Sequence, residues 1–212
     1  MIVSEIFKSI QGESTYAGLP CVFIRLAGCN LKCSWCDTPY ARVPDGALEL
    51  TVEEIAVKAR GFHCALVEIT GGEPLQQRDT KRLITDLLNE GFRVLIETNG
   101  SISLEGLDPR LVKIVDVKCP SSGHGGSFLM DNLNFITPDD EVKFVIGDRN
   151  DYEYARRFLE ECVMARTSKV LFAPVRPALE PRELAGWILK DCLPVRLQLQ
   201  IHGYIWPNER GR

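Results

Sequence analysis

The strongest constraint on the fold is an alternation of short apolar runs with longer segments of helical pattern. Residues 51–61, for example, begin with Thr51 and Glu54, a pair with capping-box spacing. The short runs are rich in β-branched and aromatic residues, which is typical of buried strands. They span residues 21–28, 65–72, 93–100, 113–120, 141–148, 169–175 and 195–203. Strands joined by helices form right-handed βαβ units, so the pattern predicts an α/β fold of mostly parallel strands.

The number of these runs also bears on how the sheet ends. Seven strands, without a full set of eight helices, favour an incomplete, TIM-like barrel over a closed one. The 212 residues are enough for one core, and no linker or internal repeat is evident, so we expect a single domain over residues 1–212.

Composition excludes several classes of function. The formal net charge of −4 argues against a broad phosphate-binding surface and therefore against nucleic acid as a partner. No run approaches the ~20 apolar residues of a membrane-spanning helix, so we expect no membrane association. Eight cysteines are too few for a disulfide framework in a chain with this much core, which favours the reducing cytoplasm.

Polar and glycine-rich sequence follows four of the predicted strands. These stretches are CNLKCSWCDT, TGGEP, ETNG and DVKCPSS. In parallel α/β folds the loops after the strands converge at one end of the sheet. The four stretches therefore predict one functional site.

Three cysteines lie within residues 29–36, the stretch that we call the cluster loop. A structural zinc site needs four ligands, usually as two pairs, and His63 with Cys64 is the lone candidate for a second pair. Three thiolates can instead bind three irons of a four-iron, four-sulfur cluster and leave the fourth open to a small molecule. Ordinary buried thiols are the simpler interpretation for the scattered cysteines 21, 64, 162 and 192.

The spacing C-x3-C-x2-C, with Trp35 before the last cysteine and GGEP after the next strand, resembles the radical S-adenosylmethionine superfamily. The resemblance implies that Cys29, Cys33 and Cys36 hold the cluster and that S-adenosylmethionine chelates its open iron. One electron from the cluster would then cleave the sulfonium and release a 5′-deoxyadenosyl radical.

The same resemblance implies which residues bind S-adenosylmethionine. Backbone groups of Gly71 and Gly72, with Glu73 beside them, would meet the methionyl ammonium group. The other residues assigned by analogy to this cofactor are Trp35, Asp37, Cys119, Pro120 and Ser121. Cys119 also invites interpretation as a fourth cluster ligand, but its distance in sequence and the need for an open iron argue against that.

Further motifs extend the resemblance over nearly the whole chain. SIQGE, FIRLAGC, WCDT, TGGEP, ETNG, DVKCPSSG and QIH together resemble the family of 7-carboxy-7-deazaguanine synthases, which act in queuosine and 7-deazapurine biosynthesis. The family implies the substrate 6-carboxy-5,6,7,8-tetrahydropterin, whose ring contracts by a radical route with loss of ammonia. It also implies a one-electron donor such as flavodoxin or ferredoxin, and a homodimer.

Candidate substrate residues follow from this family. Arg25 can form a bidentate contact with the substrate carboxylate, although an ordinary ion pair at the strand end is an alternative. The residues expected around the pterin are Ile10, Gln11, Gly12, Glu13, Thr70 and His202. Residues 11–13 could equally form a simple turn, and His202 could be a satisfied core histidine.

Thr38, two residues after the last cluster cysteine, is implied as a magnesium ligand. Magnesium keeps several waters and takes few protein oxygens, so one hydroxyl is physically reasonable. The sequence leaves two other functions open. One is an activating enzyme that generates a glycyl radical on a partner protein, and the other is a metal-stabilised binding domain that catalyses no reaction.

Overall fold

The computed structural model describes residues 1–163, 166–207, 209 and 211. Its strands are β1 (Ile2–Ile10), β2 (Pro20–Leu26), β3 (Leu48–Glu49), β4 (Leu66–Gly71), β5 (Arg93–Thr98), β6 (Val112–Asp116), β7 (Glu141–Ile146), β8 (Val170–Pro174) and β9 (Arg196–Leu197). Its α-helices are α1 (Val52–Gly61), α2 (Thr80–Asn89), α3 (Arg149–Phe158), α4 (Pro181–Lys190) and α5 (His202–Ile205). Short 3-10 turns and a π-helical turn, Leu159–Val163, complete the regular structure.

All the strands of the described chain belong to one curved sheet, in the order β3-β1-β2-β4-β5-β6-β7-β8-β9. The strands from β2 to β9 run parallel, whereas β1 lies antiparallel between β2 and β3. The two edge strands, β3 and β9, each have one neighbour within the described residues. The sheet is thus an unclosed barrel, as the sequence predicts.

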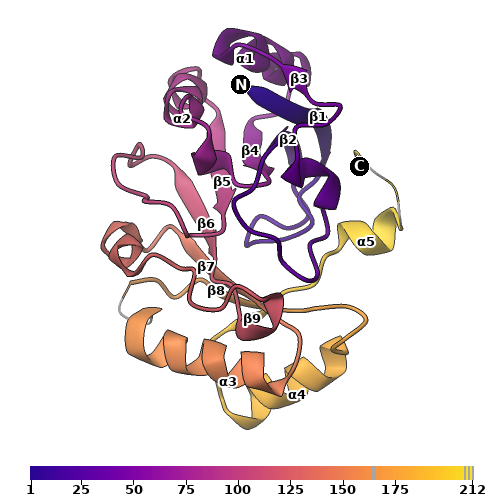
Figure 1. The fold of residues 1–212 in the computed structure, drawn as a ribbon, viewed down its shortest axis with the longest axis vertical. Helices are drawn as coiled ribbons and strands as arrows, with labels where there is room; N and C mark the ends of the chain where they lie inside the picture. The colour runs from indigo at the N-terminus through magenta and orange to yellow at the C-terminus, as the bar shows by residue number, and fades with distance from the viewer. Residues whose placement is uncertain (164–165, 208, 210, 212) are drawn as a thin grey trace.

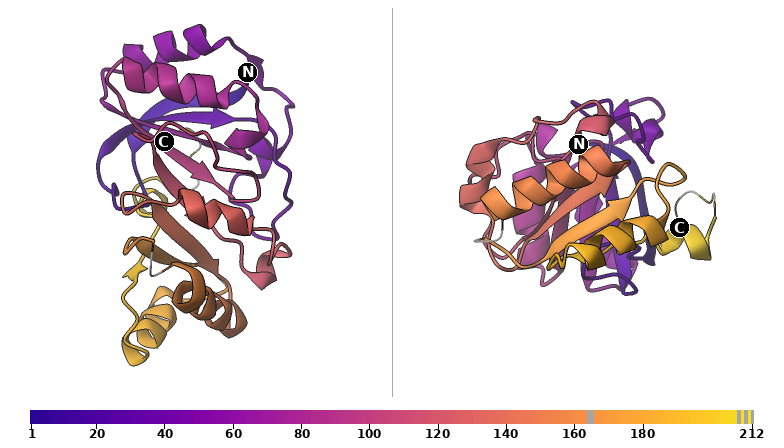
Figure 2. Two further views of the ribbon diagram at one scale, coloured as in Figure 1. Left: turned by 90° about the vertical axis from the view of Figure 1, so that its left-hand side faces the viewer. Right: turned by 90° about the horizontal axis from the view of Figure 1, so that it is seen from below.

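Helices cover the outer face of the sheet, with α1 and α2 over one half and α3 and α4 over the other (Figures 1 and 2). Two apolar clusters fill this outer layer. On α2, Leu83 and Leu87 are fully buried beneath the helix because they fall on the same helical face. The capping box of α1 is confirmed: Thr51 Oγ1 accepts from Glu54 N at 3.2 Å, and Glu54 Oε2 accepts from Thr51 N at 2.8 Å.

The inner face of the sheet changes character along the strands. A third apolar cluster fills the end of the barrel where the strands begin; its buried members are Cys21, Phe23, Leu66, Leu95, Val112 and Ile114. Side chains alternate between the faces of a strand, so the inward positions that follow are Arg25 on β2, Glu97 on β5 and Asp116 on β6. The barrel therefore has an apolar plug at one end and charged groups at the other.

The structure differs from the predicted elements at both ends of the chain. Strand β1 was not predicted, and it extends the sheet beyond the βα pattern. The strand predicted over residues 195–203 is limited to β9, and His202 begins helix α5. The sequence of residues 150–165 also has a helical pattern; α3 and the π-helical turn cover it as far as Val163, and residues 164 and 165 lie outside the described residues. Over the described part of the chain, no helix is long and apolar enough to span a membrane.

Candidate active site

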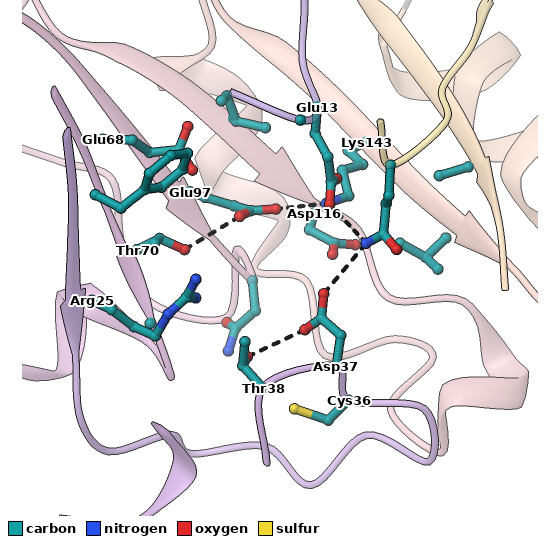
Figure 3. A pocket seen from close by; sticks show the side chains of 18 of the residues that line it. Glu13, Arg25, Cys36, Asp37, Thr38, Glu68, Thr70, Glu97, Asp116 and Lys143 are labelled. Atoms are coloured by element: carbon teal, nitrogen blue, oxygen red, sulfur yellow. Dashed lines mark hydrogen bonds and ion pairs between the residues drawn. The ribbon is translucent and has the colours of Figure 1, made fainter. Parts of the chain in front are cut away.

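A cavity of about 730 Å³ opens at the end of the barrel where the parallel strands finish. Its wall includes the cluster loop, the ends of β2, β4, β5, β6 and β7, and residues of the segment that follows β9 (Figure 3). Ligand pockets in proteins are typically about 300–1,000 Å³, so this cavity is large enough for a cofactor and a small substrate together.

The three cluster-loop cysteines all line the cavity, and each is a free, half-buried thiol. Burial raises the pKa of Cys29 and of Cys33; Cys36 adds to both shifts, and Cys29 adds to that of Cys33. No group of three or more His, Cys, Asp or Glu in the described chain converges as the ligands of one metal ion do. Sulfurs that bind different irons need not converge on one point, so the donor set fits a multi-iron cluster.

Segment 119–124 holds the cluster loop in place from behind. Ser34 N donates to Ser122 O at 3.0 Å, and Lys32 N donates to His124 Nε2 at 2.9 Å. Residues 119–124 therefore form a backing segment for the cluster loop.

Glycines 71 and 72, at the end of β4 and directly after it, are required by a close backbone approach. A Cβ on Gly71 would lie 2.0 Å from Leu26 O, and one on Gly72 would lie 2.0 Å from Gly28 O. Gly71 also has a φ of +136°, a conformation that other residues rarely adopt. Glycine at both positions lets the end of β4 lie directly against the start of the cluster loop.

Glu73 lies behind these glycines and outside the cavity wall. Its Oε1 accepts from Leu75 N at 3.0 Å and Thr98 Oγ1 at 2.8 Å, while its Oε2 accepts from Asn99 N at 2.7 Å. The side chain is fully buried, and burial raises its pKa although these hydrogen bonds oppose the shift. Both carboxylate oxygens are thus used to join the GGEP turn to the end of β5.

Lys143 on β7 lies at the centre of the charged wall. Its Nζ lies 2.6 Å from Glu13 Oε2 and 2.6 Å from Glu97 Oε1 (Figure 3). Burial would raise the pKa of Glu97, but the ammonium of Lys143 outweighs it and lowers that pKa to about 2. The same two carboxylates raise the pKa of Lys143 against the effect of its burial. The three groups form one ionised network inside the cavity.

The alternative considered for Arg25, an ion pair at the end of its strand, is present in the structure. Its Nε donates to Glu5 Oε1 at 2.9 Å. That contact uses Nε, and Figure 3 shows the end of the guanidinium directed into the cavity. Tyr40 OH also donates to Glu5, at 2.7 Å, which helps to fix this acid. Arg25 is therefore held by its inner nitrogen while its terminal nitrogens can contact a ligand.

The segment after β9 closes one side of the cavity. Gln200 Nε2 donates to Glu13 Oε1 at 2.8 Å and to Asp37 Oδ2 at 3.3 Å, so it bridges the loop after β1 to the cluster loop. Thr38 Oγ1 donates to Asp37 Oδ1 at 3.2 Å, and its side chain lines the cavity (Figure 3). These oxygens can hold a hard cation such as Mg²⁺.

Most of the predicted site residues meet in this one cavity. Four do not line it: Glu73, Cys119, Pro120 and Ser121. Cys119 is buried, and Ser121 is turned toward α3, where its N–H donates to Asp151 Oδ1 at 2.9 Å. His202 lines the cavity from the start of α5 and not from the end of a strand.

The sequence analysis missed several polar residues of the cavity wall. They are Glu68, Asp116, Lys118, Lys143 and Gln200. All but Gln200 are charged residues within or beside apolar runs that are otherwise buried, and a charge in such a run is the signal that could have found them.

The comparisons first define the class of protein. Residues 23–120 match the model of the radical SAM superfamily. The fold resembles that of QueE from Escherichia coli, with a TM-score of 0.76 at 24% identity over 94% of this chain and 93% of that one. SuiB from Streptococcus suis shares the fold over 82% of this chain, with a TM-score of 0.61. The chain, an open barrel with three cysteines at its mouth, is therefore a radical S-adenosylmethionine enzyme.

Two curated relatives then define the family. A 7-carboxy-7-deazaguanine synthase of Koribacter versatilis is 46% identical over the full length of both chains. One of Chlorobaculum tepidum is 43% identical over 99% of this chain and 96% of its own. The chain belongs to the 7-carboxy-7-deazaguanine synthase family, and its cofactors are a four-iron, four-sulfur cluster, S-adenosylmethionine and Mg²⁺.

Proposed function

We propose that this chain converts 6-carboxy-5,6,7,8-tetrahydropterin to 7-carboxy-7-deazaguanine, contracting the ring by a radical route with loss of ammonia. The observation that carries the proposal is the cavity itself: three free thiols at its mouth and a set of charged groups in its wall. A redox-active cluster and a polar, anionic substrate can therefore be held within one enclosure.

The thiols of Cys29, Cys33 and Cys36 hold the cluster in this proposal. When bound, the cluster and S-adenosylmethionine supply the radical that takes a hydrogen atom from C6 of the substrate. Gly71 and Gly72 present backbone groups to the cofactor, and Trp35 and Asp37 border it. The backing segment includes Cys119, Pro120 and Ser121, which lie outside the cavity wall. In this proposal they support the cofactor site by holding the cluster loop in place.

The other wall residues orient the substrate. Arg25 binds its carboxylate through the terminal guanidinium nitrogens, and Thr38 contributes the protein oxygen to Mg²⁺ beside it. Residues 10–13, Thr70 and His202 surround the bicycle. The surrounding chain also excludes water from the reacting carbon, which protects a radical from side reactions.

We also propose a partner and an assembly. An acidic electron carrier such as flavodoxin or ferredoxin would approach the cluster loop, where Lys32 is exposed beside Cys33. The family resemblance supports a homodimer, the free cysteines support a cytoplasmic location, and the continuous sheet supports one domain over residues 1–212. Sedimentation of the reconstituted protein would contradict the assembly if it gave a monomer.

The decisive experiment is anaerobic reconstitution followed by incubation with the pterin, S-adenosylmethionine, Mg²⁺ and a reductant. We expect 7-carboxy-7-deazaguanine by mass spectrometry. Separate replacement of each cluster-loop cysteine by Ala should abolish iron loading and turnover, whereas Cys64→Ala should leave both intact because Cys64 lies outside the cavity wall. Cleavage of S-adenosylmethionine without conversion of the pterin would contradict the proposed substrate.

A further inference from the structure

Glu68 is a buried acid in the wall of the cavity to which neither the sequence motifs nor the family assignment gives a role. Its side chain is 3% exposed and lies on β4, opposite Phe23 of the neighbouring strand β2. Glu68 occupies the inward position before Thr70 on β4 (Figure 3), and the inward residue before it, Leu66, belongs to the apolar plug. Glu68 is therefore the deepest carboxyl group that the β4 strand presents to the cavity.

Glu68 differs in its partners from Glu13, Glu97 and Asp116, three other acids that line the cavity. Glu13 and Glu97 share the ammonium of Lys143, and Asp116 pairs with Lys118 at 2.8 Å. Within the described residues, the one hydrogen bond to Glu68 comes from Gln11 Nε2, to its Oε2, and no cation contacts it. The other oxygen, Oε1, is left to accept from a ligand.

Burying such a group is costly unless something compensates. Burial raises the pKa of Glu68 well above its ordinary value, and the carboxylates of Glu97 and Glu13 add to the shift. A carboxyl group kept at that cost, facing a cavity, is a mark of a ligand-binding site. A ligand that offers N–H donors would supply the missing compensation.

The neighbouring residues indicate the shape of that ligand. Phe23 lines the cavity beside Glu68, and its ring stacks on Phe7 with centroids 5.2 Å apart. A fixed aromatic surface next to a carboxyl group suits a planar heterocycle with donors on its edge. Arg25 lies one inward position nearer the mouth than Phe23, or about 7 Å along the strand.

We propose that Glu68 binds the N3–H and 2-amino donors of the substrate's aminopyrimidinone ring and so selects 2-amino heterocycles. This rests on the proposed function. In that substrate the carboxylate and the aminopyrimidinone edge lie at opposite ends of the bicycle, which matches Arg25 near the mouth and Glu68 in the floor. Oε1 accepts one of the two donors, and the lone pair of Oε2 that Gln11 does not use accepts the other, as in the paired contact of a carboxylate with arginine. The two donors also favour the ionised form of the carboxyl group, which this contact requires. Gln11 holds the carboxyl group in the orientation that receives them.

The test uses two ligands that differ only at the 2-amino group. The product, 7-carboxy-7-deazaguanine, keeps the full donor edge, and 7-carboxy-7-deazahypoxanthine lacks the amino group. Their dissociation constants would be measured by calorimetry on the cluster-loaded parent, Glu68→Leu and Glu68→Gln. The substrate KM of each protein would be measured in parallel.

We expect the parent to prefer the amino ligand by about tenfold or more. Glu68→Leu should weaken the amino ligand by about 10- to 100-fold and the desamino ligand much less, so that the preference disappears. Glu68→Gln keeps the shape and one acceptor, and should lose part of the preference. Arg25→Lys is the matched control, because both ligands carry the carboxylate and should weaken equally.

An equal loss for both ligands in the Glu68 variants would overturn the inference, since Glu68 would then act only by positioning Gln11. A parent without preference for the amino ligand would overturn it as well. If Glu68→Leu does not fold, the same comparison on Glu68→Gln decides. Failure of the proposed function is distinguishable, because it appears as a parent that does not convert the pterin.

Discussion

At the scale of single residues, the charge balance of the cavity depends on Lys143. Its ammonium is the common partner of Glu13 and Glu97, and all three side chains are largely buried. Removing one member of a buried ion pair leaves uncompensated charge, which costs more than the pair contributes. The stability of the site is therefore most sensitive to the shared cation.

Lys143→Met should lower the free energy of unfolding by about 3–5 kcal/mol at pH 7. In the parent, Glu97 contributes stability above its ordinary pKa of 4.5, and this is lost as the pH falls toward about 2. Without the ammonium, burial raises the pKa of Glu97 instead, so the variant gains stability as the pH falls from 7 toward 4.5. Urea unfolding should show that the two proteins differ less in free energy of unfolding at pH 5 than at pH 7.

Lys169→Met is the control for that comparison. Lys169 pairs with Asp139 at 3.6 Å on the surface, where ion pairs contribute at most about 1 kcal/mol. If Lys143→Met and the parent differ in free energy of unfolding by the same amount at both pH values, Lys143 is not the group that lowers the pKa of Glu97.

Arg25→Lys tests the guanidinium fork. Lysine keeps the charge but offers no paired donors, so the KM for the pterin should rise by about 10- to 100-fold. Iron content and cleavage of S-adenosylmethionine without substrate should be unchanged. Arg60→Lys, at the exposed pair with Glu90, is the matched control and should leave the KM as in the parent. An unaltered KM in Arg25→Lys would remove Arg25 from the substrate site.

At the scale of elements, the site depends on how β2, β4 and β5 end beside one another. The two glycines at the end of β4 permit contact with the cluster loop, and Glu73 joins the same turn to Thr98 and Asn99 at the end of β5. None of these contacts involves a ligand. The turn is thus set in place by the fold before any cofactor binds.

Glu73→Gln should disturb this junction. The amide nitrogen cannot accept from the N–H groups of Leu75 and Asn99, so at least one buried donor loses its partner, at a cost of about 1–3 kcal/mol. We expect lower thermal stability together with weaker S-adenosylmethionine binding, measured by calorimetry on the reconstituted protein. A normal melting temperature with weakened cofactor binding would indicate direct contact instead.

At the scale of the whole molecule, the loop after β1 and the segment after β9 meet at the mouth of the barrel. Ile201 N donates to Gly12 O at 3.0 Å, and a Cβ on Gly12 would lie 2.0 Å from His202 Nδ1. The segment after β9 thus packs on the loop after β1, across the opening of the sheet (Figure 1). The cavity wall is complete only because this packing is close.

Gly12→Ala should therefore displace the segment after β9 and raise the KM for the pterin. If the contact with His202 is the cause, Gly12→Ala/His202→Ala should bind the product better than Gly12→Ala alone, because the smaller side chain restores the space. His202→Ala by itself measures the direct contribution of the imidazole. If the double variant binds the product no better than Gly12→Ala, the substitution acts on the backbone conformation at residue 12 and not through contact with His202.

The sequence by itself determined the fold class, the family and the position of the cluster loop. These depend on local signals: apolar periodicity, the capping box at Thr51, and cysteines whose spacing is fixed along the chain. The tertiary structure decided which polar residues form the cavity wall. β1 and the short β9 are shaped by their neighbours in the sheet, and Glu68, Asp116 and Lys143 come from strands far apart in sequence. A charge in an apolar run has no local explanation, because its partner or ligand is brought to it only when the strands curve into a barrel.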